Sequence, residues 1–187
     1  MLLLASKSPR RRELLKMLDL DFKIVDIKDV EETYPADLEA EKVPEYLSRL
    51  KADAYILELG SDDILITADT VVILDGEIIG KPRDLEDARR MLGKLSGKTH
   101  RVVTGVSITT LEKSSSFSVI TEVQFAPLSK KEIDYYVDKY RPLDKAGAYG
   151  IQEWIGAAGV ADIRGSFYNV MGLPVHRLYN ELLLFGK

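Results

Sequence analysis

Hydrophobic and polar positions follow two periods along this chain, one typical of strands and one typical of helices. Short aliphatic runs that favour strands occur at residues 1–5, 22–25 and 64–68. Apolar residues recur at every third or fourth position in segments that favour helices, at residues 9–20, 44–57, 84–95, 130–139 and 174–185. Strands and helices alternate without a linker, so the pattern predicts an α/β or α+β fold around one main sheet, in a single domain over residues 1–187.

Local signals sharpen several of these predictions. Ser8 and Pro9 are suited to the N-cap and first position of a helix, and Ser129 with Glu132 forms a capping box. Asp75-Gly76 favours the positive φ angles of a type I′ turn, which predicts a hairpin of residues 71–74 and 77–79.

Three further segments complete the prediction. Residues 99–111 and 117–125 are expected to form a longer hairpin. Residues 155–163 fit either a helix or a strand. In the helix of residues 44–57, Leu47, Leu50, Ala54 and Leu57 are expected to form one buried stripe with Lys51 at its border.

Composition narrows the chemistry that this chain can perform. It has 26 basic and 30 acidic residues, a net charge of −4 that argues against broad binding to nucleic acid or anionic lipid. The absence of cysteine and the presence of only two histidines exclude thiol nucleophiles and a multi-histidine zinc centre. Because no apolar run approaches the ~18 residues of a membrane span, we expect a cytoplasmic protein.

Three consecutive arginines lie in the first turn of the first predicted helix, at residues 10–12. Cations near the positive end of a helix dipole destabilise the helix by about 0.3–1 kcal/mol each. The same end binds anions well through its free N–H groups, to which Ser8 would add a hydroxyl. The segment therefore predicts a phosphate site, and the alternative is a basic turn that faces solvent.

Asp69-Thr70 follows the apolar run of residues 64–68, where a strand is expected to end. Ligands of α/β folds gather at the carboxyl ends of strands, so Asp69 could orient a water molecule or hold a metal ion. Lys51 and Lys81 could converge on the same place. The alternative readings are that Asp69 caps a turn and that each lysine is solvated.

Blocks of residues at 4–15, 32–33, 46–52, 68–72, 80–82, 144–152 and 165–174 follow one another in the order found in a known family. They include Ser6-Lys7-Ser8-Pro9-Arg10-Arg11, Ala68-Asp69-Thr70-Val71-Val72 and Gly80-Lys81-Pro82. On these motifs the chain resembles the Maf family of nucleoside triphosphate pyrophosphatases. The resemblance implies a mixed central β-sheet with flanking helices and a deep cleft, similar to the inosine triphosphate pyrophosphatases.

The resemblance also implies a reaction, in which a nucleoside triphosphate is cleaved to its monophosphate and pyrophosphate. Asp69 would be the proton acceptor, and Glu32 and Asp69 would hold a divalent cation, Mg²⁺ or Mn²⁺. The residues implied for the phosphates are Ser8, Arg10, Arg11, Lys51 and Lys81. Those implied for the choice of base are Arg10, Thr70 and Gln152.

The blocks at 144–152 and 165–174 resemble the branch of the family that hydrolyses dTTP and UTP, and so keeps them from incorporation into nucleic acids. Glu153-Trp154 departs from the family pattern, so modified pyrimidine nucleotides stay open as substrates. Two alternatives differ in class: a regulator of septum formation that acts by binding, and a pyrophosphatase for purine or 7-methyl-GTP substrates. The resemblance further implies a homodimer, whereas the net charge and the short apolar runs are the grounds for expecting no stable nucleic-acid partner and no membrane.

Overall fold

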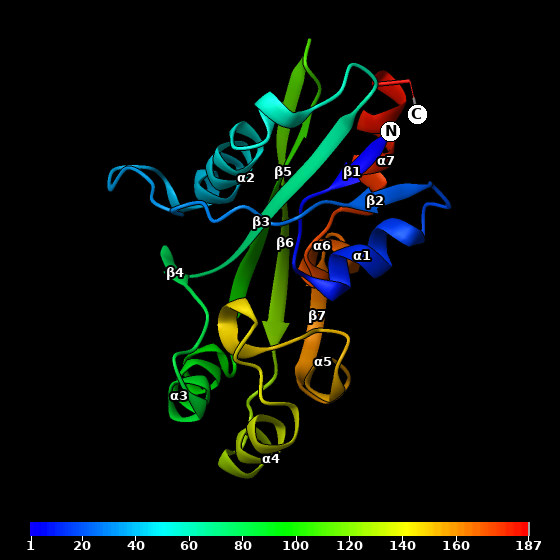
Figure 1. The fold of residues 1–187 in the computed structure, drawn as a ribbon. Coiled ribbons are helices and arrows are strands. Elements are labelled where there is room, and N and C mark those ends of the chain that lie inside the picture. The colour runs from blue at the N-terminus through cyan, green and yellow to red at the C-terminus, as the bar shows by residue number, and fades with distance from the viewer. Residues whose placement is uncertain (187) are drawn as a thin grey trace. The chain divides into compact units, whose positions relative to one another are not determined.

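The computed structural model describes residues 1–186, which form a mixed α/β fold around a seven-stranded sheet (Figure 1). The strand order is β2-β1-β3-β5-β6-β7, with β4 paired to β3. Pairing is parallel between β1 and both β2 and β3, and antiparallel between β3 and β4 and between β6 and β7. The strands are β1 (Leu2–Leu4), β2 (Phe22–Ile24), β3 (Ile64–Leu74), β4 (Glu77–Ile79), β5 (Thr99–Thr109), β6 (Ser114–Phe125) and β7 (Val160–Arg164).

Helices flank and connect these strands, and the predicted α/β class is confirmed. No helix within residues 1–186 combines the length and apolar character needed to cross a membrane. The α-helices are α1 (Pro9–Lys16), α2 (Val43–Asp53), α3 (Leu85–Leu95), α4 (Lys130–Tyr140), α5 (Trp154–Gly159), α6 (Phe167–Met171) and α7 (Val175–Leu184). The 3₁₀ helices are η1 (Ala40–Lys42), η2 (Ile56–Glu58) and η3 (Ala146–Ala148).

The chain divides into two compact units, and β3, β5 and β6 each contribute to both. Unit 1 comprises residues 1–70, 104–119 and 172–187, and unit 2 comprises residues 71–103 and 120–171. The prediction of one domain over residues 1–187 stays a prediction, as does the deep cleft.

In unit 1, α2 packs directly on β5 at Gly105. A Cβ atom built on this glycine would lie 2.1 Å from the backbone nitrogen of Glu45 in the first turn of α2. Leu47 is buried as predicted, but Leu57 is 98% exposed, so the stripe expected to reach it is shorter. The reason is that α2 ends at Asp53 and Leu57 belongs to η2, where the helical period no longer holds.

In unit 2, the short hairpin and the ambiguous segment are both resolved. Asp75 and Gly76 adopt φ angles of 52° and 86°, which confirms the predicted turn between β3 and β4. Residues 155–163 contain both alternatives, since α5 is followed directly by β7. The short helix α6 has no counterpart in the sequence prediction.

His100 lies in the core of unit 2 and is expected to make stability depend on pH. It is 2% exposed, and its Nε2 lies 2.7 Å from the hydroxyl of Tyr149. Burial lowers the pKa of His100 from 6.5 to about 4. Between these values the unfolded chain binds a proton that the folded chain does not. The free energy of unfolding therefore decreases as the pH is lowered from about 6.5 to about 4, by up to about 3 kcal/mol.

Urea unfolding between pH 4.5 and 7 tests this expectation. His100→Gln should flatten the dependence on pH, whereas His176→Gln, at an exposed position of α7, should leave it unchanged. An equal dependence on pH in the unchanged protein and in His100→Gln would contradict the assignment.

Candidate active site

The arginine-rich segment forms the start of α1, as predicted. Ser8 is the N-cap, its Oγ accepts a hydrogen bond of 3.4 Å from the backbone nitrogen of Arg11, and Pro9 follows in the first turn. The Oγ of Ser6 accepts a further bond of 3.2 Å from the nitrogen of Ser8. The helix is shorter than expected and ends at Lys16, because the chain then turns into Asp19, whose φ is 53°.

Arg11 is held in place by hydrogen bonds to two distant parts of unit 1. Its Nε donates to the carbonyl of Gly172 at 2.8 Å, and its Nη2 donates to Thr70 Oγ1 at 3.0 Å. Thr70 Oγ1 in turn lies 2.9 Å from Thr104 Oγ1. Burial lowers the pKa of Arg11, Asp69 opposes this shift, and Arg10 adds to it. The guanidinium is therefore fixed beside Thr70 by hydrogen bonds and remains cationic, since arginine stays protonated in proteins.

Lys51 joins two carboxylates from different parts of the chain. Its Nζ lies 2.6 Å from Asp69 Oδ1 and 3.0 Å from Glu32 Oε1. The side chains of Lys51 and Asp69 are only 19% and 14% exposed, whereas that of Glu32 is 53% exposed. We call these three residues the Lys51 cluster.

The position of Asp69 differs from the prediction, because β3 does not end before it. β1 pairs with β3 only as far as Ile66, and β4 pairs with β3 only from Val72 onward. Asp69 and Thr70 therefore lie in the middle of one long strand, in the stretch between these two partners. In the sequence, a polar pair inside an apolar run resembles the end of a strand, but here one strand continues through both residues.

Two of the predicted site residues, Lys81 and Gln152, belong to unit 2, where both are exposed. Their segments are joined, since the nitrogen of Gly147 donates to the carbonyl of Gly80 at 3.0 Å. Gly147 has a φ of +69°, and a Cβ there would lie 2.9 Å from Val72, so a glycine suits this junction. The approach of Lys81 and Gln152 to the Lys51 cluster stays a prediction.

Glu32 and Asp69 are the carboxylates that could hold a divalent cation. Residues 1–186 contain no group of three or more side chains that could bind a metal ion. Mg²⁺ characteristically uses one or two carboxylates and completes its coordination with water and phosphate oxygens. Two carboxylates directed at one cationic nitrogen fit that requirement.

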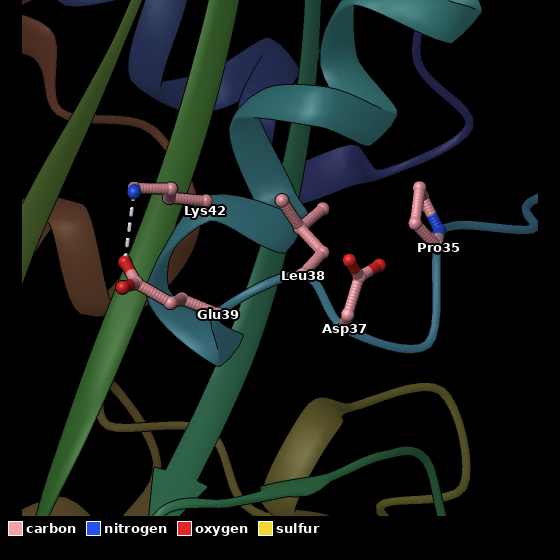
Figure 2. Close-up of a pocket in the computed structure, with 5 residues that line it drawn as sticks. All are labelled: Pro35, Asp37, Leu38, Glu39 and Lys42. Carbon is pink, nitrogen blue, oxygen red and sulfur yellow. Dashed lines mark ion pairs between the residues drawn. The ribbon is translucent and has the colours of Figure 1, made fainter.

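The hollow drawn in Figure 2 is separate from this arrangement. It has a volume of about 380 Å³ and is lined by Pro35, Asp37, Leu38, Glu39 and Lys42. An ion pair of 2.9 Å joins Glu39 and Lys42. None of the predicted site residues lines this hollow.

Sequence reasoning missed the contacts through which other residues support the site, including those of Glu153 and Gly172. Thr104 and Gly172 hold Thr70 and Arg11, and in unit 2 the side chains of Tyr136 and Glu153 bind one another beside Gln152. Gly172 lies within a recognised motif, but a buried threonine on a strand carries no signal that distinguishes it from core.

The fold is mixed α/β, and its candidate site combines the Lys51 cluster with the cation of Arg11, which interacts electrostatically with Asp69 and Glu32. The chain belongs to the Maf family, because the family model described as "Maf-like protein" matches residues 1–185. A relative from Phocaeicola vulgatus named "dTTP/UTP pyrophosphatase" is 56% identical over 181 residues, which cover 97% of this chain and 94% of the relative. One of the same name from Porphyromonas gingivalis is 57% identical over 188 residues, covering 100% and 94%.

A solved structure, that of the Ham1 protein of Staphylococcus aureus, is similar in fold. Its TM-score to this chain is 0.50, with 20% sequence identity over 67% of this chain and 71% of the other. This likeness agrees with the mixed α/β architecture expected from the sequence.

Proposed function

We propose that this protein is a nucleoside triphosphate pyrophosphatase that hydrolyses dTTP and UTP, and modified pyrimidine analogues of them, to the monophosphate and pyrophosphate. The observation that carries the proposal is the Lys51 cluster. In it the Nζ of Lys51, which can bind a phosphate, lies 2.6 Å from Oδ1 of Asp69, which can accept a proton from water. A phosphate that pairs with Lys51 lies within reach of Asp69, because both contacts share one nitrogen. The names of the relatives from Phocaeicola vulgatus and Porphyromonas gingivalis support the same substrate class.

In the proposed mechanism, Asp69 orients the attacking water and accepts its proton. The oxygen of that water forms a bond to a phosphorus atom of the anhydride as the bond between the α and β phosphates breaks, so that the products are the monophosphate and pyrophosphate. Lys51 and Arg11, together with Ser8, Arg10 and Lys81, bind the triphosphate and stabilise the negative charge of the transition state. The contacts of Arg11 with Gly172 and Thr70 orient its guanidinium before the substrate binds.

Glu32 and Asp69 would hold the divalent cation, Mg²⁺ or Mn²⁺. A bound cation of this kind supplies charge neutralisation on the phosphate oxygens. Lys51 already lies between the two carboxylates, so their charge is partly balanced before any metal arrives. Thr70, Arg10 and Gln152 would select the base, and the amide of Gln152 offers both a donor and an acceptor to a uracil or thymine edge.

The proposal is tested by measuring products from dTTP, UTP, dCTP, ITP and 7-methyl-GTP, each with Mg²⁺, with Mn²⁺ and with a chelator. We expect pyrophosphate and monophosphate from dTTP and UTP, with either metal, and a loss of both products in chelator. Release of single phosphate groups would contradict cleavage between the α and β phosphates.

The same panel separates the alternative functions. Activity confined to ITP or 7-methyl-GTP would keep the chemistry and contradict the role of Gln152. No cleavage of any substrate by folded protein would contradict the enzyme proposal and favour a regulator of septum formation that acts by binding.

A further inference from the structure

Gln152 lies in a tight turn that runs from Gly150 to Glu153. The turn is closed by a hydrogen bond of 3.0 Å from the backbone nitrogen of Glu153 to the carbonyl of Gly150. Ile151 is buried, whereas Gln152 is exposed. A Cβ atom on Gly150 would lie 3.1 Å from the Nε2 of Gln152, so the amide folds back over the glycine. The position of this amide therefore depends on how the turn is held.

The hydroxyl of Tyr136 holds the turn at both ends. It accepts a hydrogen bond of 3.0 Å from the nitrogen of Gly150, and it donates its proton to Oε2 of Glu153. Tyr136 is fully buried on α4, where it stacks on Tyr140 with ring centroids 5.0 Å apart. Burial, together with the bond to Glu153, raises the pKa of Tyr136, so the phenol keeps the proton that it donates.

The second oxygen of Glu153 is also engaged. Oε1 lies 3.2 Å from the Nζ of Lys145, which in turn lies 2.9 Å from Asp144. The side chain of Lys145 is only 10% exposed. Buried groups hold both carboxylate oxygens of Glu153, so its side chain has little freedom to rotate. The turn that ends at Glu153 is therefore held in one conformation as well.

We propose that Tyr136 and Glu153 are positioning residues that hold Gln152 in the orientation with which it distinguishes the bases of nucleoside triphosphates. This inference rests on the proposed function and assigns the residues that make its base selection specific. An amide discriminates between bases only when its donor and acceptor are fixed in direction, because a rotated amide presents the opposite pattern. Small displacements of a binding group reduce selectivity even when the group itself is retained.

The test compares Tyr136→Phe with a matched control, Tyr135→Phe. The first variant keeps the ring and removes both bonds to the turn. The second removes an exposed hydroxyl whose partner is Lys139 at 2.9 Å. We expect the ratio of kcat/KM for dTTP to that for dCTP to fall about 10-fold in Tyr136→Phe and to stay unchanged in Tyr135→Phe.

A second comparison separates positioning from a loss of stability. In protein that already carries Gln152→Ala, adding Tyr136→Phe should change the substrate ratio no further, because the amide that it positions is gone.

Glu153→Gln keeps an acceptor for Tyr136 but loses the charge that pairs with Lys145. The ratio of kcat/KM for dTTP to that for dCTP is expected to fall a few-fold in this variant. This variant carries the test where Tyr136→Phe does not fold.

An unchanged ratio in folded Tyr136→Phe would overturn the inference, as would an equal fall with and without Gln152. Failure of the unchanged protein to release pyrophosphate from dTTP is a different result. It would contradict the proposed function itself, whereas an active Tyr136→Phe with full selectivity contradicts the positioning role alone.

Discussion

Asp69→Asn is expected to lower kcat for dTTP by about 10²–10⁴-fold, the range typical of losing a general base. Asparagine has nearly the same shape as aspartate but does not accept the proton of the attacking water. The substitution also removes the negative charge of Asp69, whose Oδ1 lies 2.6 Å from the Nζ of Lys51. KM should change less than kcat, because Arg11 and the other cations still bind the triphosphate.

The Asp69→Asn protein is expected to remain folded, so a loss of activity in it can be distinguished from a loss of stability. The control is Glu58→Gln, which breaks another ion pair of unit 1, between Glu58 and Lys28 at 2.7 Å. Thermal unfolding of both variants and steady-state kinetics with dTTP and UTP make the comparison. Glu58→Gln should keep kcat, and a folded Asp69→Asn that releases pyrophosphate at the original rate would remove Asp69 from the mechanism.

The parts of the fold that were predicted correctly are those set by neighbouring residues. The N-cap at Ser8, the capping box of Ser129 and Glu132, and the Asp75-Gly76 turn all depend on short spacings, and the structure confirms each of them. The errors lie where an apolar period continues past the end of its element, as at Leu57, or where polar residues interrupt a continuous strand, as at Asp69.

The candidate site divides in the same way. Position in the predicted elements and the family motifs singled out Arg11, Asp69 and Lys51 as candidates, and their roles stay predictions. The contacts that fix them were not predictable, since Arg11 reaches a carbonyl 161 positions away. Tyr136 reads as an ordinary core position of an amphipathic helix, and only its hydroxyl contacts with Gly150 and Glu153 reveal more.

Gly105 is a place where the fold packs tightly beneath the helix that carries Lys51, and Gly105→Ala is expected to destabilise the protein by about 3 kcal/mol or more, as severe overpacking does. The added Cβ would lie 2.1 Å from the nitrogen of Glu45 and 2.2 Å from the carbonyl carbon of Pro44. Both are backbone atoms, so no side-chain rotation relieves the clash. The helix α2 must move away from β5.

Movement of α2 should also reduce activity, because the same helix carries Lys51. In Gly105→Ala protein, kcat/KM for dTTP is expected to fall even at temperatures where the protein remains folded, since a displacement of about 1 Å can cost 10²-fold in rate. Urea unfolding and kinetics on the same preparation measure the two effects.

Gly93→Ala is the matched control, and its expected effect has the opposite sign. Gly93 lies inside α3, and a Cβ atom there meets nothing within 4 Å. Alanine in a helix interior is more favourable than glycine by about 0.5–1 kcal/mol, so this variant should be slightly more stable and equally active. A Gly105→Ala protein as stable as Gly93→Ala would show that α2 does not approach β5 closely, and the placement of Lys51 beside Asp69 would then lose its support.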